Sequence, residues 1–90
     1  MYTEAIAFLL VWTLREVFAI NLRRIRHDKG LSQDDLAYDA GVSRSYLSQL
    51  EKAGKTGFYP SLKIIERLAK TLKTEPAEFL RLPAKNQRRR

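Results

Sequence analysis

The chain has 90 residues, 44% hydrophobic and 30% charged, which is enough for one small globular domain. It contains no cysteine, and this excludes disulfide scaffolds, thiolate metal sites and cysteine nucleophiles. Its single histidine, His27, cannot supply a pair of imidazole ligands, and we expect it to be an exposed surface residue. The sequence shows no nucleophile–base pairing and no phosphate-binding loop. We therefore expect a protein that is not an enzyme and that holds no metal and no cofactor.

The net charge of +7 is distributed unevenly along the chain. Residues 83–90 carry four basic side chains and no acidic one, so removing them from the total leaves +3 on residues 1–82. A mildly basic body is compatible both with a nucleic-acid partner and with an ordinary solvated surface. We interpret residues 83–90 as a disordered basic tail that adds weak, salt-sensitive attraction to DNA phosphates.

An apolar run over residues 5–12 lies near the N-terminus. A membrane-spanning helix needs about 20 such residues, and this run is about half that length. Glu4 stands where a signal peptide has a basic residue, and no small-residue cleavage site follows. The sequence therefore predicts a cytoplasmic protein without a membrane partner.

The same run exposes more apolar surface than one helix face can bury in a monomer of this size. Such a surface usually marks an interface. We expect residues 1–15 to form a helical extension that makes a dimer or binds a partner protein. Packing of this extension on its own domain is the alternative. Its candidate interface residues are Phe8, Leu9 and Trp12.

Helical periodicity dominates the rest of the chain, and no segment alternates with period two, so we predict an all-α fold. Apolar residues recur at helical spacing from Thr3 to about Asp28, as one long helix or as two helices broken near Arg15. Ser32, Ser43 and Ser61 are the expected N-caps of the next three helices, and Gly41 stops the first of these. Thr74 and Pro76 begin a short fifth helix. The helix that follows Ser61 has an apolar stripe of Leu62, Ile65, Leu68, Ala69 and Leu72, and the residues expected to be buried in the fifth helix are Phe79 and Leu80.

Two short helices separated by a three-residue turn occupy residues 33–52. Ala37 is small where the second helix must cross the first, and Gly41 allows the positive φ of a sharp turn. Val42, Leu47 and Leu50 fall on the underside of the second helix. This spacing predicts a helix-turn-helix unit.

The second of these helices, residues 44–52, carries short polar side chains on its outer face. Arg44 can bind the O6 and N7 atoms of guanine, Gln49 can bind adenine, and Ser45 and Ser48 can serve either base. A plain solvated face is the alternative interpretation.

The motifs extend well beyond this turn. They are Phe18-x3-Leu22-x2-Ile25-Arg26, Gly30-Leu31-Ser32-Gln33-x2-Leu36-Ala37, Gly41-Val42-Ser43, Leu47-Ser48-Gln49-Leu50-Glu51, Pro60-Ser61-Leu62-x2-Ile65-x2-Leu68-Ala69-x2-Leu72 and Pro76-x2-Phe79-Leu80. Together they resemble the XRE-type, Cro/repressor-like helix-turn-helix family, which includes phage repressors and restriction–modification controller proteins. The resemblance implies a five-helix domain over residues 16–82 that binds a partly palindromic operator as a homodimer.

The resemblance also implies roles for individual residues. Arg44, Ser45, Ser48 and Gln49 match positions that read bases. The expected phosphate contacts are Gln33, Ser43, Tyr46, Lys52 and Lys55. Arg26 and Glu51 match an ion pair that ties the first helix of the domain to the third. The family usually has glycine where this chain has Ala53, and the loop over residues 53–60 is longer here.

The sequence thus predicts a transcriptional regulator that binds double-stranded DNA. A phage-type repressor and a restriction–modification controller are both compatible with it. The alternative is an antitoxin that regulates its own operon and binds a toxin through the N-terminal extension.

Overall fold

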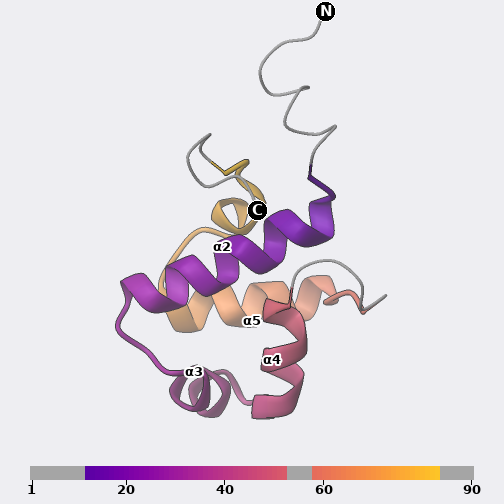
Figure 1. Cartoon of the computed structure of the whole chain (residues 1–90). Helices are drawn as coiled ribbons and strands as arrows, with labels where there is room; N and C mark the ends of the chain where they lie inside the picture. The colour runs from indigo at the N-terminus through magenta and orange to yellow at the C-terminus, as the bar shows by residue number, and fades with distance from the viewer. Residues whose placement is uncertain (1–11, 53–57, 84–90) are drawn as a thin grey trace, which may run out of the picture.

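The computed structural model describes residues 12–52 and 58–83 (Figure 1). In these two ranges the chain is all-helical, with four α-helices, one short 3-10 helix and no strand. The elements are α2 (Leu14–Asp28), α3 (Gln33–Ala40), α4 (Arg44–Glu51), α5 (Leu62–Leu72) and the 3-10 helix η1 (Pro76–Leu80). The short fifth helix expected near Pro76 is this 3-10 helix. No helix within the described ranges is long and apolar enough to cross a membrane.

The α-helices begin where local side-chain chemistry favours a start. Ser32, Ser43 and Ser61, the three N-caps expected from the sequence, each accept a hydrogen bond from a backbone N–H three residues ahead. The Thr13 hydroxyl does the same for α2, and the Glu16 carboxylate accepts a hydrogen bond from the Thr13 backbone N–H, which completes a capping box. Helix α2 therefore starts at Leu14. This start lies next to Arg15, near which the sequence offered a break between two helices as one of its alternatives. Residues 1–11 lie outside the described part of the chain.

Helix α2 contacts both α4 and η1, and α3 contacts both α4 and α5 (Figure 1). The side chains between them form one core. Its largest fully buried apolar members are Phe79, Leu22, Leu36, Leu47, Leu50, Leu68 and Leu72. The helix-turn-helix unit, α3 with α4, is thus packed on a continuous apolar base.

A buried amide attaches η1 to α2. The Asn21 side chain, in a residue only 2% exposed, donates to the backbone oxygens of Phe79 at 2.9 Å and Arg81 at 2.7 Å. Beside it the rings of Phe18 and Phe79 lie 5.6 Å apart, inclined at 59°. Asn21 therefore satisfies carbonyls that a 3-10 helix leaves unpaired at its C-terminal end.

One member of the expected apolar stripe, Leu62, and one residue expected to be buried, Leu80, are exposed. Leu62 is 83% exposed and Leu80 is 43% exposed, while Ile65 is half-buried. The prediction of burial was wrong for Leu80. Both residues stand at an end of their element, where the apolar stripe continues past the edge of the core. Together they contribute to an apolar surface described below.

Candidate nucleic-acid interface

Helix α4 has one buried side and one exposed side, as the sequence predicted for residues 44–52. Leu47 and Leu50 are fully buried beneath it. Of the four candidate base-reading residues, Arg44, Ser45 and Gln49 are exposed and Ser48 is half-buried. The structure thus brings these polar side chains to the outer surface of one short helix.

The turn before α4 is fixed by backbone geometry. Gly41 has φ 72° and ψ 32°, in the left-handed region that favours glycine. The Val42 N–H then donates to the Ala37 oxygen at 3.0 Å, which closes the end of α3. The Ser43 hydroxyl accepts from the Tyr46 N–H at 3.0 Å and starts α4. These contacts set the angle at which α4 leaves α3.

An ion pair between α2 and α4 anchors the far end of α4. Arg26 donates from Nε to Oε2 of Glu51 at 2.6 Å and from Nη2 to Oε1 at 3.0 Å, and both side chains are buried. Gln33, at the start of α3, donates its amide to Oε1 of the same carboxylate at 3.0 Å. The pair expected between Arg26 and Glu51 is therefore present, and Gln33 braces it.

Two further arginines of α2 hold the last carbonyls of α4. Arg15 donates to the backbone oxygens of Gln49 at 2.8 Å and Leu50 at 3.0 Å, and Arg23 donates to that of Glu51 at 3.0 Å. Helix C-termini leave carbonyls unpaired and carry partial negative charge, which cations offset. Sequence reasoning missed this role. The one sequence signal for it is the spacing of Arg15, Arg23 and Arg26. At 3.6 residues per turn these three side chains fall within about 80° of each other around α2, on one side of the helix.

Arg15 is also almost completely buried, at 4% exposure. Burial lowers the pKa of its guanidinium below the ordinary value, and the neighbouring Tyr59 partly opposes that shift. A guanidinium still keeps its proton in proteins. The site therefore contains a buried cation held by main-chain oxygens.

At the other end of α4, Arg44 has an acidic neighbour. Its Nε lies 3.2 Å from Oδ1 of Asp34 on α3, and both side chains are largely exposed, at 65% and 75%. An exposed pair of this kind contributes little free energy, so it can open at small cost. The pair therefore orients the Arg44 side chain only weakly, and the guanidinium is available to another acceptor.

The remaining candidates fall into different environments. Tyr46 is half-buried, and its ring packs edge-on against that of Phe58, with 5.0 Å between the ring centroids. Lys52 is exposed directly after α4. Lys55 lies outside the described residues. Over residues 12–52 and 58–83, no group of three or more histidine, aspartate or glutamate side chains is placed to hold a metal ion.

Of the three candidate interface residues near the N-terminus, only Trp12 is described by the structure. Phe8 and Leu9 lie outside the described ranges. Trp12 is only 2% exposed, which corrects the expectation that its side chain lies on an open apolar face. It directly precedes the N-cap Thr13, a position from which an apolar residue commonly packs against the fourth helical residue, here the buried Val17.

The buried ion pair should dominate the stability of this unit. We expect Arg26→Met to lower the free energy of unfolding by about 3–5 kcal/mol, because the Glu51 carboxylate stays buried without its main partner. In a domain of this size that is a fall in Tm of more than about 10 °C, measured by circular dichroism.

Two variants control for other effects of that substitution. Arg24→Met removes an exposed pair with Asp28 at 3.5 Å and a bond to the Asn21 side-chain oxygen at 3.3 Å, and it should cost about 1 kcal/mol, well below Arg26→Met. Arg26→Met combined with Glu51→Leu should recover much of the lost stability, since no charge is left unpaired. An unchanged Tm in Arg26→Met, with loss of DNA binding, would show that Arg26 contacts DNA instead.

Comparisons with known proteins give this geometry a context. The family model described as "Helix-turn-helix domain" matches residues 17–82. The chain is 39% identical over 58 residues to the HTH-type transcriptional regulator SlrR of Bacillus subtilis, a match that covers 64% of this chain and 37% of SlrR. The chain therefore spans little more than a third of the length of that curated relative.

Two solved structures are similar over most of this chain. The restriction–modification controller protein C.AhdI from Aeromonas hydrophila has a TM-score of 0.64 at 38% identity, covering 72% of this chain and 94% of that one. The biofilm regulator SinR, solved in complex with DNA, has a TM-score of 0.64 at 31% identity, covering 71% and 98%. Because the family model matches well over half of the chain, this chain belongs to the XRE-type helix-turn-helix family.

Proposed function

We propose that this chain is a sequence-specific DNA-binding regulator of transcription that acts in the cytoplasm and reads a major groove with α4. The observation that carries the proposal is the arrangement of α4, whose polar side faces outward while its other side and its C-terminal end are fixed to the body. A helix held in this way can present Arg44 and Gln49 to base edges in one fixed orientation.

Phosphate contacts would position the domain while α4 reads the bases. Ser43 and Lys52 are exposed at the two ends of α4 and lie where a helix in the groove meets the flanking backbone. The amide nitrogen of Gln33 donates to Glu51. A phosphate contact by the Gln33 side chain would therefore use the second N–H of the same amide. The proteins compared above are named as regulators and controllers, and this favours regulation over the antitoxin alternative.

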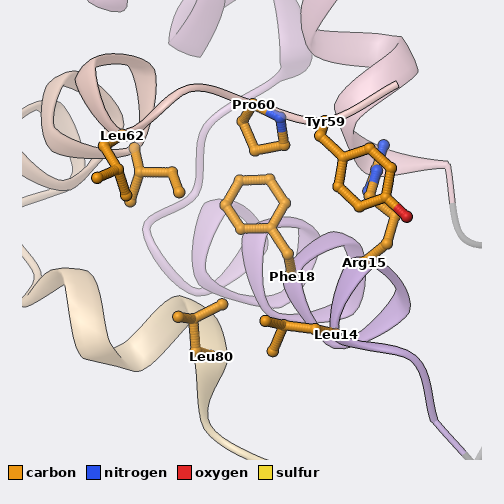
Figure 2. Close-up of a pocket in the computed structure, with 8 residues that line it drawn as sticks. Leu14, Arg15, Phe18, Tyr59, Pro60, Leu62 and Leu80 are labelled. Carbon is orange, nitrogen blue, oxygen red and sulfur yellow. The ribbon is translucent and has the colours of Figure 1, made fainter. Parts of the chain in front are cut away.

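We further propose that the regulator binds DNA as a homodimer. The described residues include five exposed large hydrophobic side chains, and four of them, Leu14, Tyr59, Leu62 and Leu80, line one open apolar pocket of about 210 Å³ (Figure 2). Exposed apolar surface gathered in one place marks an interface more often than chance exposure. A two-fold assembly would place two α4 helices on half-sites about one DNA turn apart.

DNA binding is tested by fluorescence anisotropy on the DNA fragment upstream of the coding region, with excess unrelated competitor. Wild type should resist the competitor. Arg44→Ala with Gln49→Ala should lose specific affinity by about ten- to hundredfold per lost contact, because each bidentate base contact contributes about 1–3 kcal/mol.

Lys70→Ala is the control, since it removes the same charge from an exposed site on α5. It should lower affinity for all DNA slightly and leave the preference intact. Binding that competitor removes equally from wild type and from the double variant would mean that only non-specific charge attraction operates.

The Arg44–Asp34 pair gives a gain-of-binding prediction. Asp34→Asn frees Arg44 and removes a negative charge from the DNA-facing surface, so affinity should rise a few-fold at low salt and the gain should shrink as salt increases. Asp39→Asn, an equal charge change elsewhere on α3, should give a smaller gain. Anisotropy titrations of both variants provide the measurement, and weaker binding by Asp34→Asn would contradict the proposed competition.

The homodimer is tested by light scattering. Leu62→Glu should convert a dimer into a 10.5 kDa monomer without unfolding it, because Leu62 is 83% exposed. Tyr38→Glu is the matched control, since Tyr38 is 86% exposed but lies outside the pocket. A wild-type mass equal to the monomer, or equal masses for wild type and Leu62→Glu, would refute the use of this surface.

A further inference from the structure

Arg15 joins two segments that are distant in the sequence. Its Nη atoms donate to the Gln49 and Leu50 oxygens at the end of α4, and its Nε donates to the Phe58 oxygen at 2.6 Å. Gln49 and Leu50 precede residues 53–57, and Phe58 follows them. One side chain on α2 therefore fixes both ends of the segment that leads from α4 toward α5.

The geometry requires a guanidinium. Its donors are fixed in one plane and point along separate directions, so three carbonyls from two segments can be bound at once. A buried cation is costly unless it is fully hydrogen-bonded, and here the partial negative charge of the α4 C-terminus also offsets it. A lysine ammonium has the charge but not the planar fork.

We infer that Arg15 is a positioning residue of the DNA interface, an inference that rests on the proposed DNA binding. It does not reach DNA itself, because it is 4% exposed. It holds the main chain of Gln49, a candidate base-reading residue, and the main chain of Phe58, whose ring packs on Tyr46 of α4. Arg15 thereby sets the orientation of the last turn of α4 and the course of the chain beside it.

The test compares Arg15→Met and Arg15→Lys with wild type, and Arg24→Met serves as a charge-matched control on the same helix. Two duplexes are used, the fragment upstream of the coding region and a scrambled duplex of equal length. Affinities are measured at a temperature at which circular dichroism shows each variant to be folded.

We expect Arg15→Met to lose about tenfold in affinity for the upstream fragment, the scale of one weakened base contact. On the scrambled duplex the affinity of Arg15→Met should equal that of Arg24→Met. The slope of log affinity against log salt concentration should also be the same for the two variants. Arg15→Lys, which keeps the charge, should also lose preference for the upstream fragment. A slope lowered by about 0.9 would identify Arg15 as a phosphate contact and overturn the inference.

An unchanged ratio of the two affinities in folded Arg15→Met and Arg15→Lys would mean that Arg15 serves stability alone, which also overturns it. Failure of the proposed function has a different signature, because wild type itself would then not distinguish the two duplexes. In that case amide hydrogen exchange still tests whether Arg15 holds the last turn of α4. Arg15→Met should accelerate exchange in the last turn of α4, and unchanged exchange there would refute the positioning role.

Discussion

One buried carboxylate connects the three helices on which the proposed recognition of DNA depends. Glu51 belongs to α4, and its side-chain partners Arg26 and Gln33 belong to α2 and α3. Removing a carboxylate from water costs several kcal/mol, and only well-formed bonds to both oxygens offset that cost. Any displacement of one helix against the others weakens a bond that the buried charge requires. The carboxylate thus makes the relative orientation of α2, α3 and α4 specific, which apolar packing alone defines less sharply.

The two helices of the motif end in different ways. Helix α3 ends at Gly41 in a left-handed conformation, where the backbone itself pairs the final carbonyls. Helix α4 is followed by Lys52 in an extended conformation, without a left-handed residue at this position. The Lys52 N–H makes one long bond to the Gln49 oxygen at 3.3 Å, and Arg15 and Arg23 of α2 bind the last carbonyls as well. A tertiary contact supplements a weak local cap, so the end of α4 depends on where α2 lies.

The sequence predicted those features that are encoded locally. Ser32, Ser43 and Ser61 cap helices as expected, because capping involves residues only three positions apart. The partners of Arg15 and Arg23 could not be found in the same way, because backbone carbonyls leave no mark in the sequence.

Other features depended on the extent of the core or on family resemblance. Periodicity identified the face that carries Leu62 and Leu80 but not where the core beneath it ends. The Arg26–Glu51 pair was expected through resemblance alone. The Arg44–Asp34 pair was missed, since it arises only once α3 and α4 are packed together. The exposure of residues at the ends of helices and the pairing of charged side chains therefore depend on how the helices pack, which sequence patterns and propensities do not specify.

The position of Arg15 has a thermodynamic consequence. Besides holding the end of α4, it lines the apolar pocket together with Tyr59 and Pro60, as Figure 2 shows. A partner that covers the pocket therefore lies against a wall to which this buried side chain contributes. A change of affinity transmitted in one direction must be matched by an equal factor in the other, because coupling free energies are reciprocal. If covering the pocket raises the affinity for DNA, bound DNA favours covering the pocket by the same factor, and the proposed dimer would then bind its DNA cooperatively.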